Sequence, residues 1–239
     1  FDDVTPKAYE ENHDGMTTST AIDNIGANLD AGSVVYEAPA QDMGNGYTLS
    51  TFAEFAPSAS DTAVYDGGTA PASNYGTGYG VGIKVSGNGA TFGAYANEVK
   101  TANTAAATDN NTYTGFVNYA YGPVTFGVQL AETNRGIVGA SEAITAAKTV
   151  AAASGIFETE KMSIAFQVND DLSVSYGELE ETYSAGSTTD VTMQSKSYQA
   201  AYSMGAMSVS AYHTTTDNPD WVSTALTEEI NEIALNFAF

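Results

Sequence analysis

The chain has 239 residues, contains no cysteine and carries a formal charge of −22, since 29 Asp and Glu residues stand against 7 Lys and Arg. This balance argues against nucleic-acid binding, because phosphate recognition requires clustered positive charge. The absence of cysteine excludes a disulfide framework and thiolate metal sites. No stretch approaches the ~20 apolar residues of a membrane-spanning helix, and the length suits one large all-β domain or two small ones.

The first 32 residues are acidic and precede the strand pattern. They hold seven carboxylates and one strong base, Lys7. If this stretch folds into the lumen of a pore, its carboxylates narrow the pore and favour cations. An external, solvated loop without a role in selection is the alternative.

From residue 33 onward, apolar and polar residues alternate in segments of about ten residues, the length that a tilted strand needs to cross a bilayer. Their polar positions carry mainly Gly, Ala, Ser, Thr and Gln, which fits a crowded or wet interior better than the charged outer face of a soluble sandwich. Eleven strands are predicted, at 33–39, 46–57, 78–87, 89–100, 112–121, 123–133, 161–168, 172–183, 195–204, 206–214 and 228–239.

The connections between these strands alternate in length. Short turns alternate with long polar stretches along the chain. The short turns include "SGNG", "YGP", "NDD" and "SMGA", and the long stretches include "NRGIVGASEAITAAKTVAAASG" and "TTDNPDWVSTAL". Outer-membrane barrels show this alternation, with tight periplasmic turns and long external loops. The sequence therefore predicts an all-β, transmembrane antiparallel β-barrel in a bacterial outer membrane.

Three stretches carry a resemblance to a known family. They are the terminal "ALNFAF", the passage "NLDAGSVVYEAPAQDMGNGYTLSTFAEFAP" and the opening "FDDVTPKAYEENHDG". Together they resemble the general, trimeric-type porins of Gram-negative bacteria, from the third, inward-folded loop to the last strand. The resemblance implies that residues 1–32 form the constriction loop and that residues 33–239 form barrel strands, periplasmic turns and external loops.

The resemblance also implies sixteen strands in the full barrel, of which about eleven lie in this chain. Closed single-chain barrels need an even number of strands, and the first residue is Phe rather than Met. About five strands are therefore expected before residue 1. A complete barrel of ten or twelve strands, with one loop miscounted, is the alternative.

The expected site residues fall into three groups. The carboxylates of the constriction are Asp2, Asp3, Glu10, Glu11, Asp14 and Asp23. The pore-wall candidates are Lys84, Arg135, Lys161, Lys196 and Glu232, with solvated lysines at loop bases as the alternative for the cations. By the resemblance, Phe239 and Phe237 serve as the signal for membrane insertion through the barrel assembly machinery.

The expected function is a water-filled channel for passive diffusion of small hydrophilic solutes and ions, with a preference for cations. The resemblance adds a homotrimer in contact with outer-membrane lipid and lipopolysaccharide. No GxSxG, HExxH or Walker motif is present, so an enzyme is not expected. No cofactor is expected either, although "NDD" and "TDNPD" offer oxygen ligands to calcium on external loops. The alternative function is a surface-exposed structural or calcium-binding β-protein, such as an adhesin or a layer anchor.

Overall fold

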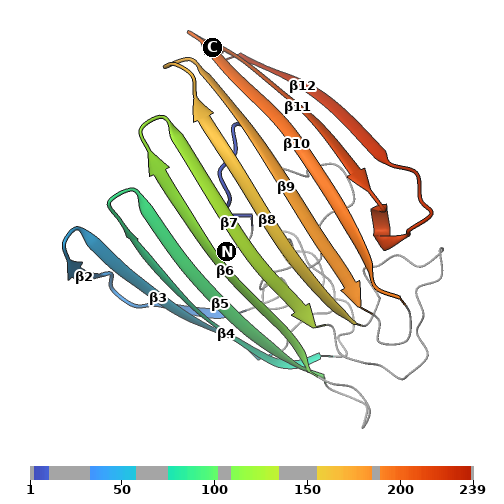
Figure 1. Cartoon of the computed structure of the whole chain (residues 1–239). Helices are drawn as coiled ribbons and strands as arrows, with labels where there is room; N and C mark the ends of the chain where they lie inside the picture. Colours follow the sequence, from blue (N-terminus) through green and yellow to red (C-terminus); the bar gives the residue numbers. More distant parts are fainter. Residues whose placement is uncertain are drawn as a thin grey trace.

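A computed structural model describes residues 3–10, 33–57, 75–101, 109–134, 155–184 and 189–237. Its strands belong to one antiparallel sheet, with one short 3₁₀ helix between the last two (Figure 1). The strands are β1 (Val34–Glu37), β2 (Gln41–Gly44), β3 (Tyr47–Ala56), β4 (Tyr75–Gly87), β5 (Ala90–Thr101), β6 (Asn110–Tyr121), β7 (Val124–Asn134), β8 (Ile156–Gln167), β9 (Leu172–Ser184), β10 (Val191–Met204), β11 (Met207–Asp217) and β12 (Glu228–Phe237), and the 3₁₀ helix is η3 (Pro219–Trp221).

From β3 onward, each strand pairs with the next strand in sequence, and β1 pairs with β3, in the order β1-β3-β4 through to β12. The short strands β1 and β2 both pair with β3, one along its second half and the other along its first. They occupy one position at the edge of the sheet, so that the sheet is eleven positions wide. The prediction of an all-β antiparallel sheet is confirmed, while the sixteen-strand total stays a prediction.

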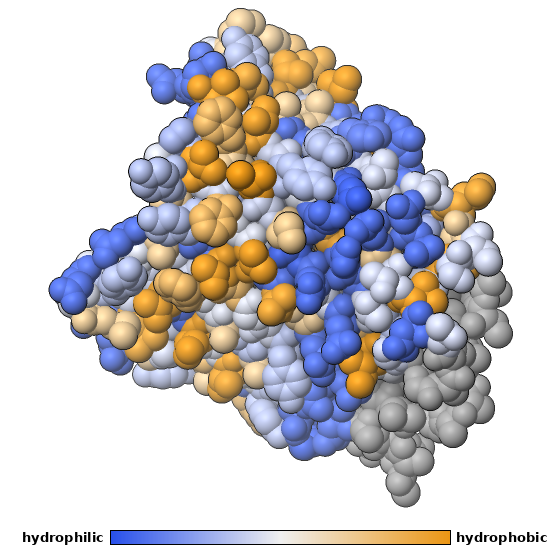
Figure 2. Space-filling model, in the orientation of Figure 1, coloured by the Kyte–Doolittle hydropathy of each residue, from blue (hydrophilic) through white to orange (hydrophobic). Residues whose placement is uncertain are grey.

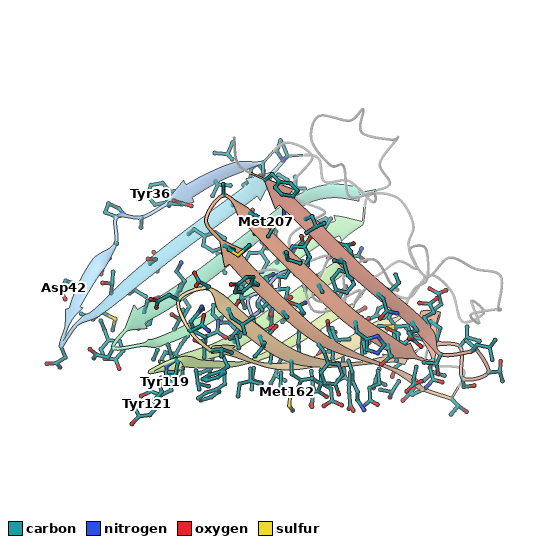
Figure 3. The ribbon with its side chains drawn as sticks, turned by 90° about the horizontal axis from the view of Figure 1, so that it is seen from above. Tyr36, Asp42, Tyr119, Tyr121, Met162 and Met207 are labelled. Atoms are coloured by element: carbon teal, nitrogen blue, oxygen red, sulfur yellow. The ribbon has the colours of Figure 1, made fainter. Side chains whose placement is uncertain are left out.

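The sheet curls into a trough with a convex and a concave face (Figure 3). Its two edges, β1 with β2 on one side and β12 on the other, are not paired with each other among the described residues. The short turns gather at one end of the strands, the turn end, and the long connections at the other, the loop end (Figure 1). Within the described ranges, no helix is long and apolar enough to cross a membrane.

The convex face carries an apolar band. Tyr119, Tyr121 and Met162 project from it (Figure 3), and the band crosses the strands as orange residues in Figure 2. Val81 keeps 59% and Ile233 75% of its surface exposed. Apolar exposure over so wide an area marks a surface that contacts lipid or protein.

The concave face is lined by small polar side chains. Gln129, Ser197 and Thr214 are fully buried, and hydroxyl groups bond across neighbouring strands, as Thr214 Oγ1 does to Ser197 Oγ at 2.9 Å. Satisfied pairs of this kind remove most of the cost of placing polar groups inside the protein.

Toward the loop end, the convex face becomes acidic and the concave face becomes partly apolar. Glu158, Glu160 and Glu180 point to the convex side and are exposed. On the concave side lies a buried apolar cluster, made up of Ala131, Phe157, Leu179, Tyr183, Met193 and Trp221, and Thr159 and Glu181 are buried beside it. β8 and β10 begin at Ile156 and Val191, whereas the sequence predicted 161 and 195, because the apolar residues change sides there and the alternation no longer indicates a strand with one apolar face.

Candidate functional site

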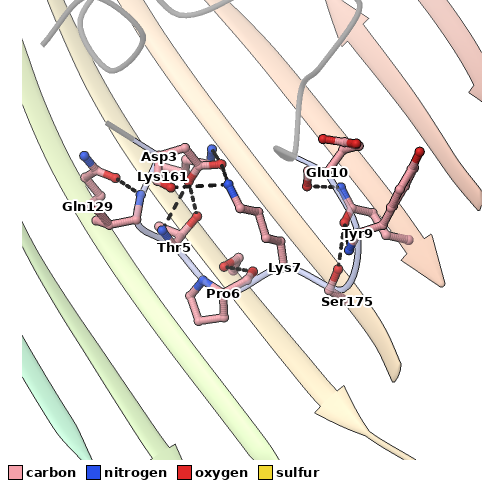
Figure 4. Close-up of polar contacts among 12 residues, drawn as sticks. Asp3, Thr5, Pro6, Lys7, Tyr9, Glu10, Gln129, Lys161 and Ser175 are labelled. Carbon is pink, nitrogen blue, oxygen red and sulfur yellow. Dashed lines mark hydrogen bonds and ion pairs between the residues drawn. The ribbon is translucent and has the colours of Figure 1, made fainter. Parts of the chain in front are cut away.

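Residues 3–10, called segment 3–10, lie against the concave face and run across the strands rather than along them (Figure 4). Side chains of β6, β7, β8, β9, β10 and β12 hydrogen-bond to this segment. Five wall side chains contact its backbone: Asn118, Gln129, Ser163, Ser175 and Gln199.

The first half of the segment is fixed by β6, β7 and β8. Asn118 Nδ2 donates to the Val4 carbonyl at 2.7 Å, and the Val4 N–H donates to Gln129 Oε1 at 3.2 Å. The Ser163 hydroxyl donates to the Pro6 carbonyl at 2.6 Å. Because Gln129 is fully buried, its bond lies in a region of low dielectric, where hydrogen bonds are stronger than in water.

The second half is fixed by β9 and β10. The Ala8 N–H donates to Ser175 Oγ at 2.9 Å, and the Tyr9 N–H donates to Gln199 Oε1 at 3.1 Å. The amide nitrogen of the same Gln199 donates to the Glu10 carbonyl at 2.8 Å. The amide group of Gln199 has both a donor and an acceptor, so that this one side chain on the inward side of β10 satisfies two backbone groups of the segment.

The side chain of Tyr9 continues toward the edge strand β12. Its hydroxyl donates to Glu232 Oε1 at 3.2 Å, and the Tyr212 hydroxyl donates to Glu232 Oε2 at 3.3 Å. The two tyrosine rings lie 6.3 Å apart. Glu232 therefore faces the concave side, as its parity in the strand predicted.

Asp3 supplies a buried charged anchor. Its Oδ2 lies 2.6 Å from Lys161 Nζ, and both side chains have no exposed surface. The Thr5 hydroxyl donates to Oδ1 at 2.7 Å, and Lys7 Nζ lies 3.7 Å from Oδ2. Burial alone would raise the pKa of Asp3, but the Lys161 ammonium and the Thr5 hydroxyl outweigh it and lower the pKa from 3.8 to about 2.

This lowered pKa fixes the direction of the pH dependence. A carboxyl group whose pKa is lowered by folding stabilises the folded state when the pH is above the pKa of the unfolded chain. This contribution is lost as the pH falls through the pKa of the folded protein. The anchor is expected to stay intact from pH 7 to about 4 and to be lost between about 4 and 2, a change on the order of 2 kcal/mol. Hydrogen exchange of residues 3–10 against pH measures it, with Asp3→Asn as the variant that lacks the transition. A release centred near neutral pH would contradict the ion pair as the anchor.

Gly127 lets segment 3–10 approach β7 closely. A Cβ atom at this position would lie 2.1 Å from Asn118 Oδ1 and 2.5 Å from Pro6 Cδ. No side chain fits there without moving the segment, because real Cβ atoms do not approach heavy atoms so closely.

The wall formed by β3, β4 and β5 carries its own polar and charged side chains on the concave face. Glu54 on β3 accepts a hydrogen bond from the Tyr95 hydroxyl on β5, across the intervening strand. Gly80 makes this possible, since a Cβ there would lie 2.6 Å from both Glu54 Oε1 and the Tyr95 oxygen. Lys84 lies on the same face of β4 and is exposed.

The structure brings together part of the predicted site. Asp3, Glu10, Lys161 and Glu232 meet on the concave face through segment 3–10, and Lys84 lies apart on β4. Lys196 departs from the prediction. It shares the convex parity of Tyr198, and its Nζ lies 3.5 Å from Glu178 Oε1. The predicted site residues that lie outside the described residues are Asp2, Glu11, Asp14, Asp23, Arg135 and Phe239.

Sequence reasoning missed the neutral side chains that hold the segment. Gln129, Ser163 and Gln199 stand at polar positions of the alternation, and that parity is the one signal that pointed to the interior. Among the described residues, no group of three or more His, Cys, Asp or Glu is placed to hold a metal ion.

Comparison with known proteins identifies a fold likeness. A solved structure of a porin, refined at 1.8 Å resolution, matches with a TM-score of 0.56 and 12% sequence identity. The match covers 86% of this chain and 60% of the porin, so the chain spans about three fifths of that protein's length. No protein-family model and no curated protein sequence matches the chain. The likeness shows that the fold is porin-like.

Proposed function

We propose that this chain belongs to an outer-membrane channel through which small hydrophilic solutes and ions diffuse passively, without a catalysed reaction. The observation that carries this proposal is segment 3–10, which crosses a polar concave face inside a porin-like sheet whose convex face is apolar. Two faces of opposite polarity suit a barrel wall between lipid and water, and a chain segment inside such a wall narrows the passage.

The proposal includes a preference for cations. The chain carries a formal charge of −22, and Glu10, Glu54 and Glu232 lie on the side of the trough that would face the channel. Lys161 is neutralised by Asp3 in a buried ion pair, so that it adds little positive potential. A confined space with excess carboxylates raises the local concentration of cations.

The proposed channel is a trimer that is inserted into the outer membrane. The apolar band supports contact with membrane lipid, and the acidic loop end of the convex face would lie at the level of the headgroups. A homotrimer, contact with lipopolysaccharide and recognition of Phe237 and Phe239 by the assembly machinery are proposed from the sequence resemblance.

Conductance across a planar lipid bilayer tests the function. The protein purified in detergent is expected to produce stepwise increases in current, and a salt gradient is expected to give reversal potentials of the sign carried by cations. The absence of steps from protein that is folded and inserted would overturn the channel. Reversal potentials of the opposite sign would overturn the cation preference alone.

A further inference from the structure

The connection between β11 and β12 places one large side chain, that of Trp221, against the inner side of the sheet. It spans residues 218–227 and contains η3 at the loop end (Figure 1). Asn218, Asp220 and Trp221 have φ values of 51°, 55° and 54°. Positive φ is uncommon for residues other than glycine and persists where the surrounding structure fixes it.

Trp221 is the part of this connection that is held most firmly. Only 4% of its surface is exposed, and its indole N–H donates to the Glu181 carbonyl at 3.1 Å. The indole ring meets the Phe157 ring edge-on at a centroid distance of 5.1 Å and lies 6.4 Å from the Tyr183 ring. The side chain therefore crosses from the β11–β12 connection to β9 and β8 on the inner side of the sheet.

These contacts make an apolar block on the concave face, beside the buried and hydrogen-bonded pair Thr159 and Glu181. The block consists of the cluster described above, and Val191 packs against it. It lies next to the anchor of segment 3–10, because Leu179 is the cross-strand neighbour of Lys161. Leu179 is 1% exposed, so the block also excludes water from one side of the Lys161–Asp3 pair. At the loop end the block shares the inward positions with buried polar side chains, among them Thr133 and Ser195.

We propose that Trp221 and its connection form a second restriction, at the loop-end mouth of the channel, which sets the size of the solutes admitted together with segment 3–10. This inference rests on the proposed channel function. Residues folded over the inner side of a wall reduce the open cross-section, and both conductance and size exclusion depend on that cross-section.

The position of the indole can be measured independently of conductance, because Trp221 is the single tryptophan of the chain. The folded protein is expected to emit at the short wavelengths typical of a buried indole and to resist quenching by acrylamide. Leu226→Ala is the matched control in the same connection, since Leu226 is 88% exposed, and it is expected to leave both signals unchanged. Emission and quenching like those of tryptophan in water would overturn the inward fold of the connection.

The effect on the channel is tested with Trp221→Ala. Single-channel conductance is expected to rise, since the connection loses the side chain that holds it at the mouth, and larger neutral sugars are expected to enter liposomes faster. Ile233→Ala, which changes a 75% exposed side chain on the convex face, is the control for conductance and is expected to match the unmodified protein. Unchanged conductance in a folded Trp221→Ala variant would overturn the second restriction while leaving the channel in place. An unmodified protein without conductance would instead overturn the proposed function. If Trp221→Ala does not fold, Trp221→Phe, which keeps an aromatic ring but loses the N–H bond, is expected to give a smaller rise, and no rise would count against the inference.

Discussion

Replacing Lys161 by methionine is expected to release segment 3–10 from the concave face. The substitution leaves the Asp3 carboxylate buried without its closest cation, which lies 2.6 Å away, and breaking a buried ion pair from one side costs about 3–5 kcal/mol. The segment can avoid this cost by moving Asp3 into water, so the loss is expected to appear as undocking. Hydrogen exchange of residues 3–10 measures the undocking, and bilayer conductance measures its effect on the passage.

Two controls separate the ion pair from the loss of a lysine as such. Lys84→Met removes an exposed lysine from the same face of the sheet and is expected to leave the exchange of residues 3–10 unchanged. The double variant Asp3→Asn with Lys161→Met removes both charges, and it is expected to restore much of the protection, because no unpaired buried charge remains. Equal loss of protection in the single and the double variant would contradict the role of the pair.

Replacing Gly127 by alanine is expected to lift the middle of segment 3–10 from β7. The added methyl group would meet Asn118 Oδ1 at 2.1 Å and Pro6 Cδ at 2.5 Å, and overpacking of this kind costs about 1–3 kcal/mol. The Asn118 side chain and Pro6 must both move, and the hydrogen bond from Asn118 to Val4 is expected to be lost. Faster exchange at Val4 and a larger or noisier conductance are the expected results.

Gly115→Ala is the matched control for Gly127→Ala. Gly115 lies on the adjacent strand β6, and a Cβ atom there meets only the Gly93 carbonyl, at an ordinary 3.7 Å. Both variants change the same residue type in a strand, so their shared effect on backbone entropy cancels in the comparison. A Gly127→Ala protein indistinguishable from Gly115→Ala would show that segment 3–10 does not rest on β7 in solution.

The alternation of apolar and polar residues was sufficient to predict the strands near the turn end. In β9, for example, Leu172, Val174 and Tyr176 share the convex side, as period-2 reasoning requires. The same rule misleads toward the loop end, where Glu178 continues that convex parity and Leu179 turns inward. The alternation within one strand shows which side chains share a side of the sheet. Whether that side is buried or exposed depends on the other parts of the protein that pack against it.

The contacts of segment 3–10 were beyond sequence reasoning for a different physical reason. The bond between Tyr9 and Gln199 joins residues 190 positions apart, and no local preference encodes such a pair. The side of Lys196 could not be predicted either, because its neighbours Ser195 and Ser197 are polar and give no alternation of apolar and polar residues at this point of the strand. Trp221 lay in a stretch that resembled a polar loop, and its neighbours on β8 and β9 become apparent only once the connection has folded over them.

The hydrogen bonds to segment 3–10 have a consequence for how this protein tolerates change. Side chains of the wall hydrogen-bond to main-chain atoms of Val4, Pro6, Ala8 and Glu10. Side-chain substitutions at these positions leave those main-chain donors and acceptors in place. Apart from the side-chain contacts of Asp3 and Tyr9, the route of the segment and the chemical character of the surface that it presents to the trough are therefore determined by different atoms. A substitution such as Ala8 to a charged residue can therefore change the charge on the concave side while the segment keeps its route.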